Sequence, residues 1–430
     1  MADAKDLGKQ MYELCELLFP ICRSITGNGV RKTLSIIKQH LPGIQVHEVP
    51  SGTAVFDWTV PKEWDIEDAY IIDPSGKKIV DFHQCNLHVV GYSTPIDATL
   101  DLDDLQEHLY SLPDQPAAIP YITSYYKERW GFCISEQMRK SLQPGKYHVV
   151  IKSKLFDGSL TYGELLLPGK TTKEIFLSTY ICHPSMANNE LSGPVVTTFL
   201  VKWLMQIPDR YYSYRVVFIP ETIGSITYLS KHLEHMKERI VAGFVITCIG
   251  DNRAYSVLTS RNENTLADEV ALHVLKNLHP EFIKYSFLER GSDERQYCSP
   301  GVDLPVASIM RTKYGRYPEY HTSLDDLSLI SPEGLQGGFE AVQKCIEVLE
   351  NNMTPKVRTL CEPQLGKRNL YPTLSTKKSG EYIKDMMNLI AYSDGKRTLL
   401  EIAELINVPA WKLHDIVEKL RKEDLLEVVR

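Results

Sequence analysis

Apolar strand-like runs that alternate with helix-like stretches constrain the fold of this chain more than any other feature. The runs are EIFLSTYI (174–181), RVVFIP (215–220), VAGFVITCI (241–249) and LPVASIM (304–310). Helices are predicted over 192–206, near 225–238, over 264–278 and over about 332–351. Strands that are apolar throughout and separated by helices are typical of a mostly parallel sheet covered on both faces. We therefore predict an α/β fold with such a sheet, sandwiched by helices, at its centre.

Two further segments differ from this α/β core in their residue pattern. Residues 46–165 alternate short runs rich in Val, Ile, Tyr and Trp with turns such as DPSGKK (73–78), which predicts a β-rich inserted domain. The α/β domain would then comprise residues 1–45 and 166–352. Residues 353–376 lack periodicity and are predicted to form a linker.

Residues 377–430 show the outline of a winged helix-turn-helix domain. Helices are predicted over 398–406 and 410–421, with the short turn NVP between them and a strand at the end. DNA-binding domains carry a basic surface, whereas residues 381–430 contain eight Lys or Arg against ten Asp or Glu. The sequence therefore favours packing or protein interaction over nucleic-acid binding. This domain and the β-rich insert are natural places for contacts in a homo-oligomer.

Charge and cysteine content exclude several classes of protein. The net charge of −7 gives no general attraction to nucleic acid or to anionic membranes. No apolar run approaches the roughly 18 residues that span a bilayer. The nine cysteines include no C-x-x-C pair, which excludes a thiolate zinc site and is typical of reduced thiols. Acidic residues near the start argue against a signal peptide, so we expect a cytoplasmic protein.

Polar residues follow the predicted strands, at the edge of the sheet where ligands gather in such folds. His183, Glu221 and Asp251 each come after one apolar run, and the loop YHTSLDD (320–326) follows the last run. Imidazole and carboxylate groups are the usual ligands of catalytic zinc, and a nearby carboxylate can act as general base. Plainer alternatives exist for each residue. A lone histidine is more often structural, Glu221 could cap the next helix, and Asp251 could form an Asx turn.

The order of these motifs resembles the zinc aminopeptidase superfamily, whose fold also hosts glutaminyl cyclases. The matching segments are His183, NELSG (189–193), ETIG (221–224), Asp251, GSDERQY (291–297) and HTSLDD (321–326). The whole layout is similar to bacterial aminopeptidase-like proteins that carry a C-terminal winged helix and are linked with polysaccharide biosynthesis. The resemblance implies a zinc-exopeptidase-like fold and hydrolysis of a peptide or amide bond, most simply by an aminopeptidase.

The resemblance also implies roles for single residues. The general base would be Glu221, and the metal ligands would be His183, Asp251 and His321, with Asn189 or Glu190 as a further candidate. Asn189 stands where the family has a bridging aspartate, and Thr222 stands where it has a second glutamate. Two zinc ions close together need bridging negative charge, so these departures favour one Zn²⁺ ion over two.

Four residues between the last strands and the loop around His321 are predicted to bind a small peptide or amide substrate: Asp293, Arg295, Arg311 and Tyr320. Two alternatives to an aminopeptidase stay open. One is a single-zinc amide hydrolase or acyl transferase that acts on a glycan precursor. The other is a non-catalytic, peptidase-like binding or regulatory protein. The loss of two expected ligands favours the second alternative, whereas retention of both histidines, Glu221 and Asp251 favours an enzyme.

Overall fold

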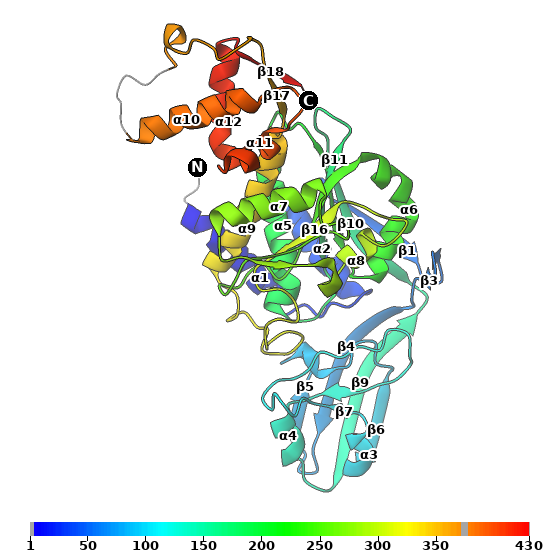
Figure 1. Cartoon of the computed structure of the whole chain (residues 1–430). Coiled ribbons are helices and arrows are strands. Elements are labelled where there is room, and N and C mark those ends of the chain that lie inside the picture. The colour runs from blue at the N-terminus through cyan, green and yellow to red at the C-terminus, as the bar shows by residue number, and fades with distance from the viewer. Residues whose placement is uncertain (1–3, 371–376, 430) are drawn as a thin grey trace. The chain divides into compact units, whose positions relative to one another are not determined.

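The computed structural model describes residues 4–370 and 377–429 (Figure 1). The chain divides into two compact units. Unit 1 comprises Met1–Asp268 and Phe282–Glu340, and unit 2 comprises Glu269–Glu281 and Ala341–Arg430. Among the described residues, no helix combines the length and the apolar character needed to cross a bilayer.

Unit 1 is built around an eight-stranded sheet. In spatial order its strands are β1 (Gln45–Pro50), β10 (Ser159–Leu167), β12 (Ser213–Ile219), β11 (Glu174–Tyr180), β13 (Ile240–Ile246), β16 (Val306–Met310), β14 (Ser256–Leu258) and β15 (Ile283–Tyr285). The central strands β12, β11, β13 and β16 pair in parallel, as do β14 and β15, while the remaining neighbours are antiparallel. Every residue of β11 is buried, because helices cover both faces. The prediction of a mostly parallel sheet is confirmed.

Helices α2 (Asn28–His40) and α6 (Ile223–Arg239) cover opposite faces of this sheet. A Cβ atom added at Gly163 would approach Leu34 of α2 to 2.7 Å, whereas the adjacent Glu164 accepts a hydrogen bond from Tyr228 of α6. Successive residues of a strand point to opposite faces, so the two helices must lie on different sides. Helix α5 (Ser192–Met205) packs with α1 (Ala4–Leu18) and α2, and α6 packs with the short helix α8 (Glu294–Tyr297).

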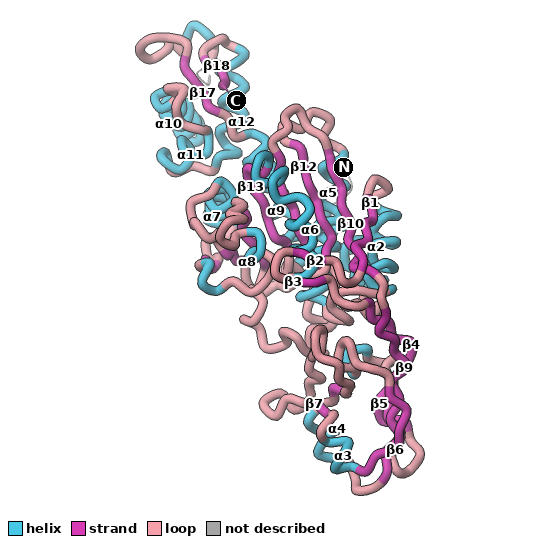
Figure 2. Tube along the Cα trace, turned by 90° about the vertical axis from the view of Figure 1, so that its right-hand side faces the viewer, coloured by secondary structure: helices cyan, strands magenta, loops and turns pink. Residues whose placement is uncertain are grey.

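A second, antiparallel sheet in unit 1 has the order β5 (Lys78–Asp81), β4 (Glu63–Ile72), β9 (Lys146–Phe156) and β6 (Ile96–Asp101) (Figure 2). Short elements accompany it: β2 (Ala54–Val55), β3 (Trp58–Thr59), α3 (Leu102–Gln106), β7 (Leu109–Tyr110), β8 (Phe132–Cys133) and α4 (Glu136–Ser141). The predicted insert bounds 46–165 also take in most of β1 and β10, which belong to the central sheet. Both strands pair antiparallel with their neighbours, as the strands of the insert do, and the sequence did not separate them.

Unit 2 contains the winged helix. Its elements are β17 (Thr354–Val357), α10 (Lys377–Tyr392), α11 (Leu399–Ile406), α12 (Ala410–Lys422) and β18 (Leu426–Val429). Thr398 and Glu401 form a capping box that starts α11. Strand β17 pairs antiparallel with β18, although it lies in the stretch predicted as a linker. It escaped prediction because it is only four residues long and contains Pro355. Residues 371–376 of the predicted linker lie outside the described residues.

Helices α7 (Leu266–Leu278) and α9 (Pro332–Asn351) each contribute residues to both units. Both agree with the sequence prediction to within about two residues, as do α5, α6, α11 and α12. Such long amphipathic or apolar segments are the elements that periodicity predicts best.

Candidate functional site

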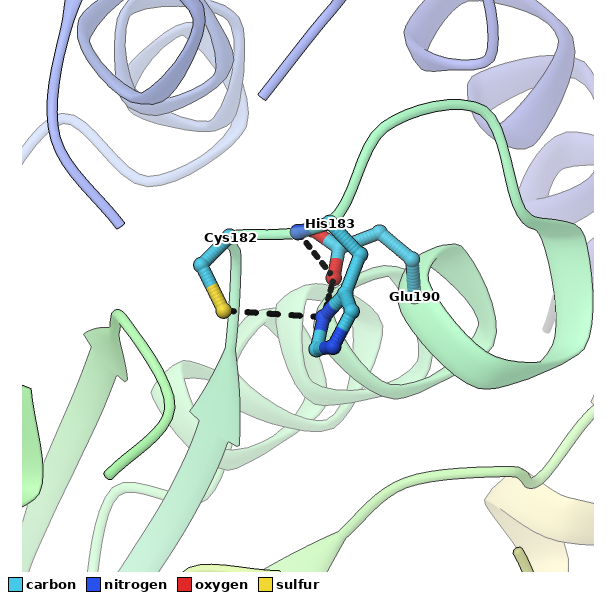
Figure 3. Close-up of side chains that lie close together, drawn as sticks. All are labelled: Cys182, His183 and Glu190. Carbon is cyan, nitrogen blue, oxygen red and sulfur yellow. Dashed lines mark hydrogen bonds and ion pairs between the residues drawn. The ribbon is translucent and has the colours of Figure 1, made fainter. Parts of the chain in front are cut away.

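His183 lies three residues beyond the end of β11 and is fixed by Glu190 (Figure 3). One carboxylate oxygen of Glu190 accepts hydrogen bonds from the backbone N–H and from Nδ1 of His183, each at 3.0 Å. Glu190 belongs to a π-helical turn, Ala187–Leu191, that leads into α5. A carboxylate can only accept hydrogen bonds, so Nδ1 of His183 carries a proton. The other ring nitrogen, Nε2, faces away from Glu190. Nε2 lies 3.7 Å from a carboxylate oxygen of Glu221.

The other oxygen of Glu190 lies 3.0 Å from Nε of Arg23, and both side chains are fully buried. Arg23 also donates to the backbone oxygens of His183 and Leu18, at 2.9 Å each. Burial lowers the pKa of Arg23, while the adjacent Glu190 acts in the opposite direction. One oxygen of Glu190 thus orients the histidine, while the other lies in the ion pair with Arg23 and has no hydrogen-bond partner among the described residues.

Glu221 follows β12 and points into the same space as His183. One of its oxygens accepts a hydrogen bond from the hydroxyl of Ser292 at 2.6 Å. Burial raises the pKa of Glu221 above its ordinary value, and the neighbouring His183 only partly offsets this rise. A glutamate with a raised pKa, whose side chain is 21% exposed, is suited to take up a proton and to release it again.

The turn that carries Glu221 is held by Asp293. Thr222 has φ 64° and ψ −80°, a conformation that a β-branched residue rarely adopts. Its N–H donates to Asp293 at 2.7 Å, and the hydroxyl of Ser225 donates to the same oxygen at 2.8 Å. Burial and the nearby Glu221 raise the pKa of Asp293 to about 7. Asp293 therefore supports the strained turn and does not line the cavity described below.

His321 approaches His183 from the loop between β16 and α9. The two ring centroids lie 5.4 Å apart, and Tyr320 stacks on the outer side of His321 at 3.9 Å. His321 has φ 57°, another strained value. Its Nε2 atom is buried and has no hydrogen-bond partner within the described part of the chain. Burial and the neighbouring His183 lower the pKa of His321 to about 3, so its imidazole is neutral and keeps a free lone pair.

Asp251 is not brought to the two histidines as a ligand. Its carboxylate accepts hydrogen bonds from the N–H of Arg253 at 2.8 Å, from the N–H and hydroxyl of Thr312 at 2.9 and 2.7 Å, and from Asn188 at 3.1 Å. These contacts join the loops that follow β13 and β16. In residues 4–370 and 377–429, the one group of three donor residues within 4.8 Å of one another is Cys182, His183 and Glu190. The sequence placed Asp251 at the correct edge of the sheet but did not determine where its side chain points.

Asn189 and Cys182 complete the surroundings of His183. The amide nitrogen of Asn189 donates to the hydroxyl of Tyr180 at 2.8 Å, and its backbone N–H donates to Asp325 at 3.0 Å. Its side-chain oxygen is buried without a hydrogen-bond partner among the described atoms. Burial raises the pKa of Cys182 well above its ordinary value, which favours the protonated thiol.

A cavity of about 380 Å³ opens beside His183, Glu221 and His321. Its other lining residues are Ile25, Trp58, Tyr121, Thr123, Tyr125, Tyr126, Cys182, Thr222, Ile223 and Arg295. The four aromatic residues come from the segment predicted as an independent β-rich insert, and the sequence analysis therefore missed them. The signal available was the aromatic cluster PYITSYY (120–126) next to a proline.

The aromatic wall is attached to the loop that carries His321. The N–H of Tyr121 donates to the backbone oxygen of His321 at 2.9 Å, and the N–H of Ser323 donates to that of Ile119 at 2.9 Å. The ring of Tyr121 lies 5.2 Å from that of His183 and 5.1 Å from that of His321. The insert segment and both histidines thus form one wall of the cavity.

The predicted substrate residues fall into different places. Arg295 lines the cavity, whereas Tyr320 lies behind His321. Arg311 is buried outside the cavity, donates to the backbone oxygen of Ala254 at 2.8 Å and lies 3.8 Å above the ring of Tyr255. For Arg311 the geometry indicates a structural role.

Comparison with known proteins places this site in a family. The family model described as Domain of unknown function (DUF4910) matches residues 12–352. The chain belongs to this family. A second model, a winged helix-turn-helix, matches residues 352–428. The C-terminal winged helix predicted from the sequence is confirmed.

Solved and curated relatives give the same architecture. A Clostridium acetobutylicum protein, provisionally described as a polysaccharide biosynthesis protein with aminopeptidase-like domain, is 44% identical over 431 residues, which is 99% of this chain and 98% of that protein. The crystal structure of a provisionally assigned peptidase from Clostridium acetobutylicum has a TM-score of 0.93 at 44% identity and covers 99% of this chain and 97% of that one. BSAP, a zinc aminopeptidase from Bacillus subtilis, has a TM-score of 0.57 at 16% identity, covering 80% and 94%. The fold is aminopeptidase-like, as the resemblance implied.

The donor atoms beside the cavity are compatible with a divalent ion. A carboxylate holds Nδ1 of His183, as is usual for metal-binding histidines, and the neutral His321 offers a buried nitrogen without a partner among the described residues. Asn189 and Thr222, which stand where the resemblance expects acidic residues, are uncharged. A third ligand would have to come from Glu221, water or substrate.

Proposed function

We propose that the cavity hydrolyses a peptide or amide bond with one divalent ion, of which zinc is the best match to imidazole donors. The observation that carries the proposal is the convergence of His183, His321 and Glu221 on one cavity, with 3.7 Å between His183 Nε2 and Glu221. An amide hydrolase needs a polarised carbonyl, an activated water and a group that moves one proton. The three side chains together match these requirements.

In this proposal His183 and His321 would hold the ion, and a bound ion would supply a Lewis acid that polarises water and the carbonyl. Glu221 would accept a proton from water while the oxygen of that water bonds to the carbonyl carbon. The carbon–nitrogen bond then breaks, and Glu221 returns the proton to the leaving amine. The burial that raises the pKa of Glu221 favours both transfers, because the protonated state is not costly there.

The simplest specific activity is that of an aminopeptidase acting on small peptides. A second candidate is an amide on a glycan precursor, such as an acylated amino sugar. The description of the relative in polysaccharide biosynthesis supports it, and so does the cavity wall of Trp58, Tyr121, Tyr125 and Tyr126, on which a sugar ring can stack.

A protein without catalytic activity is the remaining alternative. It draws support from the engagement of Asp251 and Glu190 in internal contacts, which leaves few anionic donors for a metal. Such a protein would bind peptides or sugars in the same cavity. Metal content and turnover separate it from the enzyme.

The test combines elemental analysis with turnover on alanine and leucine p-nitroanilides and on N-acetylglucosamine. We expect about one zinc per chain and cleavage of at least one substrate. In Glu221→Gln, turnover should fall by about 10²-fold or more while the metal stays bound. Glu234→Gln, on an exposed position of α6, is the matched control and should leave turnover unchanged. Unchanged turnover in Glu221→Gln would remove this residue from the mechanism, and a metal-free, inactive wild type would support the binding protein.

A further inference from the structure

Arg295 is a cation in the cavity wall that has no anionic partner in the described part of the chain. One guanidinium nitrogen, Nη2, donates to the hydroxyl of Thr222 at 2.5 Å, and Nε is buried without any hydrogen-bond partner. By contrast, Arg253 and Arg316 form ion pairs with Glu319 and Glu289. Arg295 acts on Glu221 only through space, where its charge tends to lower the pKa of that carboxyl. A partly buried guanidinium that has an unused donor and no counter-charge is suited to bind an anionic group of a ligand.

The remainder of the cavity limits what can fill that position. Arg295 is the one lysine or arginine among its lining residues, and Glu221 is the one acid. The opposite wall is aromatic, with Tyr121 and Tyr125 joined by a hydrogen bond of 2.8 Å between their hydroxyls. A volume of about 380 Å³ accommodates a small molecule rather than a long peptide. A fitting ligand therefore carries a single negative charge next to an apolar or ring-shaped body.

We propose that the substrate carries a carboxylate that binds Arg295, so that the cavity takes a small carboxylate-bearing amide such as an N-acyl amino acid or a dipeptide. This inference rests on the proposed amide hydrolysis and specifies its substrate class. Nε is buried in the wall and Nη2 donates to Thr222, so a carboxylate would bind the part of the guanidinium that lines the cavity, or would replace Thr222 as the partner of Nη2. A phosphate dianion would bring two charges to one arginine beside the acidic Glu221, so carboxylate is the better match.

The position of Arg295 also determines how the ligand would be oriented in the cavity. Arg295 contacts Thr222, the residue after Glu221, so a carboxylate held there lies close to the proton-transferring group. The amide bond next to that carboxylate would then lie near Glu221 and His183. The binding energy of the carboxylate would position the reacting bond, which is a common use of arginine at active sites.

The experiment is a calorimetric titration of the full chain with three probes: N-acetyl-L-alanine, its uncharged primary amide, and inorganic phosphate. The acid and the amide differ only in the group that Arg295 would recognise. We expect the acid to bind about tenfold or more tightly than the amide, since hydrogen bonds between charged groups exceed those to a neutral group by this amount. In Arg295→Gln this preference should disappear. Arg295→Lys, which keeps the charge without the fork, should retain part of it.

Arg290→Gln is the matched control, because Arg290 is exposed, lies five residues before Arg295 and does not line the cavity. It should bind all three probes as the wild type does. Equal binding of acid and amide, a preference that survives in Arg295→Gln, or no binding of the acid overturns the proposal. Tighter binding of phosphate than of the acid replaces carboxylate by a phosphate group. The titration requires no turnover, so its failure is distinct from a failure of Glu221→Gln to lose activity.

Discussion

Glu190 accepts two hydrogen bonds from His183, one from its backbone N–H and one from Nδ1, each at 3.0 Å. The residues are seven positions apart, and the π-helical turn between them brings the carboxylate back to the start of its own loop. The imidazole therefore cannot rotate without breaking a buried charged contact. This contact fixes which nitrogen of His183 faces the cavity.

Glu190→Gln should destabilise unit 1 strongly. The substitution leaves the buried Arg23 without a counter-charge, which costs roughly 3–5 kcal/mol in comparable buried pairs. Glu13→Gln breaks the exposed pair with Lys9 and should change the free energy of unfolding by less than about 0.5 kcal/mol. Urea denaturation followed by circular dichroism measures both values. Equal effects of the two substitutions would contradict the structural role of Glu190.

Asp251 and His321 should respond to substitution in opposite ways. Asp251→Ala leaves one buried and three partly buried donors without their acceptor, so it should cost about 3 kcal/mol of stability while zinc content stays unchanged. His321→Ala removes a buried nitrogen without a partner, so it should lose zinc with little effect on stability. Elemental analysis and thermal melting of the two variants are sufficient. Loss of zinc in Asp251→Ala would restore this residue as a ligand.

Tyr121→Ala should weaken metal binding although Tyr121 is not a ligand. Its ring packs against both histidines and keeps their separation fixed. Residues that orient metal ligands typically change affinity by about 10- to 100-fold. Tyr121→Phe keeps the ring and loses only the hydroxyl contact to Tyr125, so it should bind zinc within about threefold of the wild type. Competition with a fluorescent zinc chelator measures both affinities.

His414 should make the winged helix sensitive to acid. Burial, together with the positive charge of Lys344, lowers the pKa of this α12 histidine to about 4, and its Nε2 has no hydrogen-bond partner within the described residues. An unfolded histidine titrates near 6.5, so the unfolded chain binds more protons between pH 6.5 and pH 4. The contribution of His414 to the free energy of unfolding is therefore fully present above pH 6.5. It falls by up to about 3 kcal/mol as the pH drops to 4.

Hydrogen exchange of the α12 amides, corrected for the intrinsic effect of pH, measures this loss. His414→Leu should remove the pH dependence of protection in α12. His148→Gln, on the exposed side of β9, should leave that dependence unchanged. A loss of protection on acidification that is as large in His414→Leu as in the wild type would assign the acid sensitivity to other groups.

The sequence predicted the elements of the fold better than it predicted the geometry of the site. Apolar runs and helical periodicity sufficed for the four central strands β11, β12, β13 and β16, for α5, α6, α11 and α12, and for the edge at which polar residues gather. Side-chain direction did not follow from these patterns. Asp251 lies five residues beyond the end of β13, where the strand alternation no longer determines orientation. The roles predicted for His183, Glu221 and His321 remain predictions, although one cavity brings the three residues together.

The aromatic wall lay beyond sequence reasoning for another reason. Tyr121 contacts His321 across a separation of 200 residues, and no local pattern signals such a pairing. The insert also shows the alternation of an independent β-rich domain. A contribution from it to the cavity could be recognised only once the chain was folded.

The pairing of residues 119–121 with the loop around His321 has a consequence for the newly synthesised chain. At typical translation speeds roughly 10–40 s separate the appearance of these two segments at the ribosome. During that interval residues 119–121 lack this partner, and the cavity lacks the wall that the loop around His321 provides. A product truncated before residue 321 would therefore lack His321 and would leave residues 119–121 without this partner.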